Sequence, residues 1–425
     1  MGASNRLWNK NFIILWQGQL ISDLGNGIFN AILSLWVLDI TGSKIMMGTI
    51  LACLSLPRVI FGPVAGTFAD RHSRKWIIVL TDAIRGILFT GVGVMALSMG
   101  AGFPAEVLYP VAVVSGLCSA FFSPAIISAI PDIVCMEKLA KANSLRTLSQ
   151  ALSQLVGFAC GTVLFTQFKA APLVFGYGIC FIYAAATQLF MTIPKTSSSA
   201  EQKHIFYDIW AGMKYTFSQK GIRTLIIIGM FLNFFANIGI TLLAPLFKEE
   251  PGYGTAIFGP VMATMMVGQL IGMGLVSLLK IKPNDRPKMF YLSVVALIGC
   301  MIPVGLVSNV YLMFPLALVI GTSVSIMTIL MYTLLQITVA PENRGKVFGI
   351  MSTVFEGLTP VAQSASGGLA EAFGENGVRK TIVSAFACAG VVLLFAFFNK
   401  PFQAFLKSEP LEASCEIKQE NLPPA

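Results

Sequence analysis

Charged residues are scarce in this chain of 425 residues, where Asp, Glu, Lys and Arg together make up 12% of the total. Soluble domains carry about 25% charged residues, so the composition excludes an ordinary soluble globule. The hydrophobic residues, 55% of the chain, fall in repeated blocks of about twenty, the length of a helix that crosses a bilayer. The sequence therefore predicts an all-α membrane protein.

The residue patterns of common active sites are also missing. The chain has no Walker loop for ATP, no Ser-His-Asp candidates and no metal-ligand spacing, and its eight cysteines include no CxxC pair. Its two histidines, His72 and His204, fall in predicted inner loops, so neither can relay protons within the membrane. We therefore expect that the protein is not an enzyme, uses no cofactor and has no metal site. The driving energy would come from an ion gradient or from the substrate's own gradient.

Polar interruptions divide the sequence into six apolar spans, a hydrophilic stretch and six further spans. These twelve spans lie near residues 12–38, 46–68, 76–99, 106–129, 147–166, 172–193, 222–247, 256–279, 289–308, 311–335, 346–370 and 380–399. They predict a first six-helix bundle over residues 1–193, a cytoplasmic linker over 194–220, a second six-helix bundle over 221–400 and a cytoplasmic tail over 401–425.

The linker is polar at first and then amphipathic. Ile205, Ile209, Met213 and Phe217 recur at fourfold spacing, as on one face of a surface helix. We expect a connecting helix that lies on the inner leaflet, and a partner-binding element is the alternative. The charged tail is predicted to be disordered.

The net charge of +9 could indicate a nucleic-acid partner, but the placement of the positive charges argues against one. Cytoplasmic loops of membrane proteins are enriched in Lys and Arg. Of the 29 Lys and Arg residues, only five fall in loops predicted to lie outside the cell: Lys44, Lys169, Lys248, Arg379 and Lys380. This distribution requires an even number of spans and predicts that both termini are cytoplasmic.

The two halves of the sequence echo each other. Gly62 and Gly66 recur as Gly268 and Gly272, 206 residues further along the chain. Duplicated six-helix halves are the build of many secondary transporters, which hold their substrate between the halves. The sequence therefore predicts two pseudo-symmetric bundles.

A basic motif follows the second predicted span. The stretch "GPVAGTFADRHSRKWII" places Gly66, Asp70, Arg71, Arg74 and Lys75 at the fixed positions of the pattern G-x-x-x-D-R-x-x-R-K. In this it resembles the loop between the second and third helices of the major facilitator superfamily. The resemblance implies that superfamily's fold of twelve helices and transport by alternating access. The basic side chains would hold the loop in the cytoplasm and can bind anionic lipid headgroups.

The acidic residue of the motif, Asp70, implies a gating role. In the superfamily its carboxylate binds the start of the eleventh helix, here near Gly345, and so locks one access state; such a contact stabilises by about 1 kcal/mol. The alternative is a topology anchor, which explains the arginines but leaves the acid unexplained. Val276 stands at the equivalent position of the second half, so the acid is present in one half only.

Within the superfamily, the chain resembles bacterial macrolide-efflux proteins and the siderophore exporters near them. The resemblance rests on "LWQGQLIS", "LPRVIFGPVAGTFADR", "FFSPAIISAIPDIVCMEKLAKANSL" and "PENRGKVFGI". Two features depart from drug/proton antiporters. Many of those carry an arginine in the fourth helix, where this chain has Ser115, and the fifth helix, "VGFACGTVL", lacks the usual Gly-Pro. Proton antiport therefore rests on the resemblance alone.

Ionisable residues within the predicted spans need a reason, because each costs roughly 2.5–3.5 kcal/mol on insertion scales. Asp23 lies near the middle of the first span, with Gln19 and Asn26 beside it. The resemblance implies that this helix lines the central cavity. We therefore take these three residues as candidates for binding substrate or protons, with a satisfied polar contact between helices as the alternative for Asp23.

Four further charged residues lie within spans. Arg58 and Glu356 reach a similar depth to Asp23. The resemblance implies that their helices face each other across the two halves, so they could form an ion pair that breaks during transport; separate local partners are the alternative. Asp82 and Arg85 are three residues apart on the third span, which is the spacing of an ion pair within one helix.

These observations predict a bacterial inner-membrane transporter that exports a bulky, amphipathic, macrolide-like compound and so confers antibiotic resistance. Protons are the expected coupling ion, membrane lipids are expected partners, and we expect a monomer. Two alternatives remain within transport, a siderophore exporter and a lysophospholipid transporter. A third is a receptor that does not transport but is built on the same scaffold.

Overall fold

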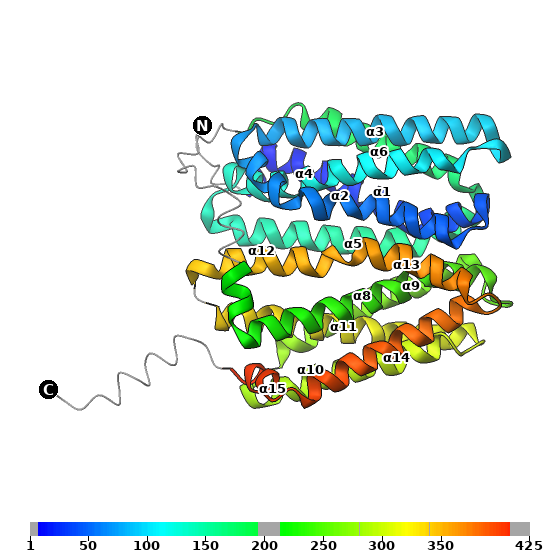
Figure 1. Cartoon of the computed structure of the whole chain (residues 1–425). Coiled ribbons are helices and arrows are strands. Elements are labelled where there is room, and N and C mark those ends of the chain that lie inside the picture. The colour runs from blue at the N-terminus through cyan, green and yellow to red at the C-terminus, as the bar shows by residue number, and fades with distance from the viewer. Residues whose placement is uncertain (1–6, 194–212, 280, 340, 409–425) are drawn as a thin grey trace. The chain divides into compact units, whose positions relative to one another are not determined.

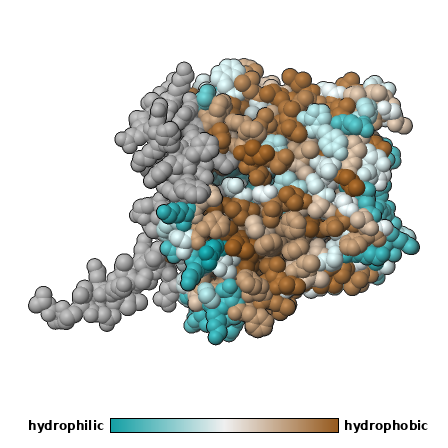
Figure 2. Space-filling model, in the orientation of Figure 1, coloured by the Kyte–Doolittle hydropathy of each residue, from teal (hydrophilic) through white to brown (hydrophobic). Residues whose placement is uncertain are grey.

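The computed structural model describes residues 7–193, 213–279, 281–339 and 341–408 of the chain, and these residues are helical almost throughout. Eleven helices in the described residues are long and apolar enough to cross a membrane. Hydrophobic side chains gather over the middle of the face shown in Figure 2, with hydrophilic ones toward the helix ends. The all-α membrane fold predicted from composition is confirmed.

The helices follow the predicted order along the chain (Figure 1). The first half contains α1 (Lys10–Thr41), α2 (Lys44–Arg71), α3 (Arg74–Met99), α4 (Leu108–Ile133), α5 (Met136–Phe168) and α6 (Ala170–Gln188). The second half contains α8 (Lys220–Glu249), α9 (Thr255–Leu278), α10 (Arg286–Val304), α11 (Met313–Thr338), α12 (Pro341–Gly357), α13 (Thr359–Ala372), α14 (Gly377–Phe398) and α15 (Lys400–Leu406). Short 3-10 helices precede α4, α10 and α11, namely η1 (Gly100–Gly102), η2 (Ala105–Val107), η3 (Pro283–Asp285) and η4 (Val310–Leu312).

The turn between α1 and α2 is only two residues long and is fixed by its own chemistry. Gly42 ends α1 in the left-handed conformation, with φ of 67°, which glycine adopts without steric cost. Ser43 then accepts a hydrogen bond from the backbone N–H of Met46 and caps the start of α2. We call the end of these helices that carries Gly42 and Ser43 the turn end, and the opposite end, where His72 and Ser73 join α2 to α3, the motif end.

Two helices differ from the predicted spans in their bounds. The fifth was predicted from residue 147, but α5 begins at Met136, because the stretch before residue 147 is polar yet contains no helix breaker. The eleventh, predicted as one span over 346–370, is divided into α12 and α13 at Leu358. Pro360 explains this break, since it lacks a backbone N–H and its ring disfavours helical backbone in the residue before it.

The described chain forms two compact units. The first contains α1 to α6 together with Ile240–Ala263 and Thr359–Val378. The second contains the remaining parts of α8 and α9, and α10, α11, α12, α15 and nearly all of α14. The first unit thus includes the end of α8, the start of α9 and the whole of α13.

Close backbone contact holds the first unit together. Gly157 on α5 lies so near Gly27 on α1 that a Cβ atom added to Gly157 would stand 2.5 Å from the Cα atom of Gly27. Small residues of this kind allow membrane helices to pack backbone against backbone. The contact aligns α1, which carries Asp23, with α5, which carries Arg146.

The predicted linker is described only at its end. Residues 213–218 are helical, with Met213 and Phe217 exposed. The earlier part of the linker and the tail beyond residue 408 lie outside the described residues.

Candidate functional site

Asp23 lies on α1, inside the first unit, with its side chain partly buried. The positive charges that act on its carboxylate are Arg146 on α5 and Arg85 on α3. Within the described residues, no hydrogen-bond donor or ion-pair partner lies within bonding distance of Asp23. The carboxylate is therefore near two guanidinium groups but is held by neither, which leaves it free to bind a proton or a ligand.

Arg146 is a member of this site that sequence reasoning missed. It falls between the predicted fourth and fifth spans, but α5 begins earlier and carries Arg146 on the helix, where it is partly buried and interacts electrostatically with Asp23. The unbroken run of helix-forming residues over 136–147 is the signal that could have found it.

The predicted pair on α3 is present and deeply buried. Arg85 Nη2 donates to Asp82 Oδ1 at 2.6 Å, and the two side chains are only 5% and 0% exposed. The guanidinium also lies over two aromatic rings, 4.5 Å from the centroid of Phe122 and 4.3 Å from that of Phe181. Cation–π contacts of this kind stabilise a desolvated cation by about 2 kcal/mol.

Some buried polar atoms of the first unit, one of them on Asp82 itself, have no hydrogen-bond partner in the described residues. Gln188, at the end of α6, lies near enough to Asp82 to act on its carboxylate. At standard hydrogen-bond geometry, however, Asp82 Oδ2, both amide atoms of Gln188 and Ser22 Oγ have no partner in the described residues. Each unpaired buried group costs about 1–3 kcal/mol, so the site has unused capacity to bind water or an exchangeable proton.

The charges of this site balance. Asp23 and Asp82 act electrostatically on each other, and each is also acted on by Arg85. Two carboxylates and two guanidinium groups, with Arg146 as the second cation, are formally neutral. Binding of one proton would give the cluster a net positive charge, and Coulomb energies are large in such a low-dielectric interior. We call Asp23, Asp82, Arg85 and Arg146 the charged cluster.

The two polar neighbours predicted for Asp23 have different surroundings. Asn26 Oδ1 accepts a hydrogen bond of 2.6 Å from the hydroxyl of Tyr177 on α6, and the ring of Tyr177 stacks on Phe29 with centroids 4.5 Å apart. The structure thus gives Asn26 a partner between helices. Gln19 is 7% exposed and has no described hydrogen bond.

The residues of the other predicted ion pair are both exposed. Arg58 lies on α2 in the first unit and Glu356 on α12 in the second. Their pairing stays a prediction.

The motif occupies the end of α2 and the start of α3. The side chains of Gly66, Asp70 and Arg71 are outside what the structure describes, so the predicted lock stays a prediction. Arg74 forms an ion pair with Asp132 on α4 and donates to the carbonyl of Ser128 at 3.0 Å. Asp132 could not be predicted as its partner, because the two residues are 58 positions apart. Lys75 lies 5.7 Å from the ring centroid of Trp76.

Comparison with known proteins identifies the family. The sequence model of the Major Facilitator Superfamily matches residues 15–362, most of the chain. The chain belongs to the major facilitator superfamily. It is therefore a multi-pass membrane transporter for a small-molecule substrate.

The following relative and solved structures are distantly similar in sequence. Macrolide efflux protein A of Streptococcus pyogenes is 24% identical over 376 residues, which cover 87% of this chain and 91% of the relative. Among solved structures, the nucleoside transporter NupG is 15% identical with a TM-score of 0.73, over 94% of this chain and 99% of its own. A bacterial homologue of the human lysosomal transporter Spinster, solved in an inward-facing and occupied conformation, is 15% identical with a TM-score of 0.68, over 97% and 98%. These structures share the transporter fold with this chain.

Proposed function

We propose that this transporter exports a bulky amphipathic compound by alternating access and that proton entry drives the export. The observation that carries the proposal is Asp23, a partly buried carboxylate on a membrane-spanning helix that has two arginines nearby and no described hydrogen-bond partner. Such a carboxylate can take up a proton from one side of the membrane and release it to the other. The name of the Streptococcus pyogenes relative, a macrolide efflux protein, supports the direction and the substrate class.

The proposal includes the predicted orientation. Both termini would be cytoplasmic in a bacterial inner membrane, which puts the motif end inside the cell and the turn end outside. Asp70 would lock the motif end closed in one access state. Arg71 and Lys75 would contact lipid headgroups, while Arg74 is bound to Asp132. Arg58 and Glu356 would pair between the halves, and the chain would act as a monomer.

The coupling role is tested with Asp23→Asn, which keeps the size of the side chain and removes its ionisation. In inverted vesicles we expect proton-driven accumulation of a radiolabelled macrolide to fall about tenfold or more, within the usual range of coupling free energies. Exchange of labelled for unlabelled macrolide without a gradient should persist, because binding does not require the proton.

The matched control is Asp285→Asn, which changes an exposed carboxylate in the 3-10 helix before α10. It should accumulate macrolide as the parent does. Proton-driven accumulation by Asp23→Asn at the parental rate would show that Asp23 is not the coupling residue.

The substrate class is tested separately with a panel of radiolabelled macrolides, siderophores and lysophospholipids in the same vesicles. Accumulation of macrolides alone supports the proposal. Accumulation of siderophores or lysophospholipids instead would assign the chain to one of the alternative transport functions. Binding of a compound with no accumulation of any would favour the receptor.

A further inference from the structure

Helices α2 and α13 lie against each other at the turn end of the first unit. A Cβ atom added to Gly48 on α2 would stand 2.3 Å from the carbonyl oxygen of Gln363, and one added to Gly367 on α13 would stand 2.2 Å from that of Lys44. Ser55 Oγ on α2 donates to Gln363 Oε1 at 2.7 Å. The two helices are therefore in backbone contact over about two turns.

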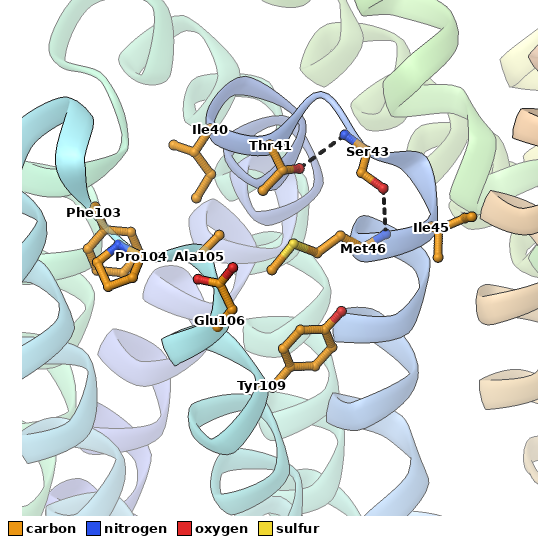
Figure 3. Close-up of a pocket in the computed structure, with 10 residues that line it drawn as sticks. All are labelled: Ile40, Thr41, Ser43, Ile45, Met46, Phe103, Pro104, Ala105, Glu106 and Tyr109. Atoms are coloured by element: carbon orange, nitrogen blue, oxygen red, sulfur yellow. Dashed lines mark hydrogen bonds between the residues drawn. The ribbon is translucent and has the colours of Figure 1, made fainter.

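A carboxylate from the end of α13 closes this contact. Glu371 Oε1 accepts hydrogen bonds from the backbone N–H of Ile45 at 2.8 Å and from the hydroxyl of Ser43 at 3.1 Å. The same hydroxyl accepts a hydrogen bond from the N–H of Met46 at 3.1 Å, which is drawn in Figure 3. Ser43 also borders a hollow of about 450 Å³. Glu371 and Ser43 together satisfy the second and third N–H groups of α2, which have no partner within the helix.

Two ion pairs lie at the same end of the unit. Lys44 Nζ, in the first turn of α2, is 2.8 Å from Glu249 Oε1, and Lys248 Nζ is 2.6 Å from Asp39 Oδ1 on α1. Lys248 and Glu249 are the last two residues of α8. Segments from the second half of the sequence are thus bound to α1 and α2 through groups that water can replace.

We propose that Glu371 is a latch that holds the turn end closed and releases the N-terminus of α2 when that end opens. The latch reverses the arrangement predicted for Asp70. Asp70 lies at the end of the second membrane helix, α2, and is predicted to bind the start of the eleventh, which α12 and α13 form. Glu371 lies at the end of that eleventh membrane helix and binds the start of α2. The same two helices would then be fastened alternately at opposite ends. The inference rests on alternating access in the proposed function.

The two latches alternate because each depends on a hydrogen bond, which forms only at short distance. A hydrogen bond between Glu371 and Ile45 exists only while the end of α13 touches the start of α2. Opening the turn end breaks it and exposes the backbone N–H of Ile45, which water then solvates, while the N–H of Met46 keeps its bond to Ser43. Each latch therefore favours only one access state, and a difference in affinity between states is what shifts such an equilibrium. Removal of Glu371 should favour the state that is open at the turn end.

The test measures access to α2 without any substrate. Ala52, one turn from Gly48 on α2, is 8% exposed, and Ala52→Cys in a cysteine-free background provides a reporter that an impermeant maleimide reaches when the helices separate. In nanodiscs, where both ends of the protein are accessible, we expect Glu371→Ala to raise the labelling rate about fivefold, which corresponds to ~1 kcal/mol of lost helix-terminus stabilisation. Glu375→Ala removes a nearby exposed carboxylate and should leave the rate unchanged.

A second pair of variants keeps the helix cap intact. Asp and Asn both cap helices well, but Ser43→Asp places a negative charge against Glu371 and Ser43→Asn does not. Ser43→Asp should label faster than Ser43→Asn, and addition of Glu371→Gln should remove the difference. Equal labelling of Glu371→Ala and Glu375→Ala, or of Ser43→Asp and Ser43→Asn, would overturn the latch. Neither result depends on the transported compound, so the latch and the proposed export can fail independently.

Discussion

Arg85 shows how a cation can be kept inside a membrane-spanning helix. Asp82 neutralises it, Phe122 and Phe181 cover it from two sides, and the carbonyl of Thr81 accepts a hydrogen bond from its Nε at 3.3 Å. Such a pair is costly to desolvate and stable only while both charges are present, because removal of one leaves the other uncompensated.

This balance predicts the effect of a substitution at Asp82. Asp82→Ala should destabilise the protein by about 3–5 kcal/mol, because Arg85 loses its counter-charge. The double variant Asp82→Leu with Arg85→Met removes both charges and should recover most of the loss. Thermal unfolding in detergent, followed by gel filtration, measures both. A double variant less stable than Asp82→Ala would contradict the argument.

At the scale of residues, the sequence predicted the pair but not its surroundings. Spacing within one helix brings Asp82 to Arg85, and a mid-span acid identifies Asp23. Phe122, Phe181 and Arg146 come from other helices, and nothing in a single sequence says which faces of those helices meet. Hydropathy also placed Arg146 outside the predicted helix, because a span predicted from hydropathy begins only where the sequence becomes apolar.

At the scale of helices, one threonine repairs a defect that a proline creates. Pro260 in α9 cannot donate to the carbonyl of Ala256, four residues earlier. Thr162 on α5, which is fully buried, donates its hydroxyl to that carbonyl at 3.1 Å and accepts from the N–H of Gly259 at 3.1 Å. The side chain of one helix thus substitutes for a missing bond in another.

Thr162→Val tests this repair, since it keeps the shape of the side chain and loses the hydroxyl. It leaves the carbonyl of Ala256 and the N–H of Gly259 without this partner, and we expect a loss of stability of about 2 kcal/mol. Thr166→Val is the control, because Thr166 is exposed and bonds only within its own helix, to the carbonyl of Val163. Equal unfolding temperatures for the two variants would show that Thr162 has no such role.

Close packing of α1 and α5 gives a second expectation at this scale. Gly157→Ala puts a methyl group 2.5 Å from the Cα atom of Gly27, so the helices must separate and stability should fall by about 1–3 kcal/mol. Gly176→Ala on α6 meets no atom within 4 Å and should be neutral or slightly stabilising, because Ala favours helix. The unfolding temperatures of both variants, measured in detergent, check this. A Gly157→Ala variant as stable as Gly176→Ala would refute it.

The helices themselves were predictable because long apolar runs leave little choice of structure in a bilayer. Their ends were less so. α5 starts 11 residues before its predicted start, because helix propensity continues where hydropathy stops. The division at Leu358 could have been predicted from Pro360, but the apolar residues on both sides of it read as one span.

At the scale of the whole molecule, the orientation in the membrane stays a prediction from the distribution of Lys and Arg. In intact cells, an impermeant maleimide should label Glu375→Cys, beside the turn end, and not Ser73→Cys, at the motif end, in a cysteine-free background. Both positions are exposed, so both should react once the cells are made permeable. Labelling of Ser73→Cys alone in intact cells would mean the opposite orientation.

The chain passes from one compact unit to the other within α8, at Gly239–Ile240, within α9, at Ala263–Thr264, and between α12 and α13, at Leu358–Thr359. A proline follows or precedes each passage closely: Pro245, Pro260 and Pro360. Pro245 and Pro260 each remove one bond of the helix ladder, and Pro360 stands just after the break between α12 and α13. In mechanical terms these are compliant joints in otherwise stiff rods. We therefore expect a given force to bend α8 and α9 more at these joints than in their uninterrupted turns.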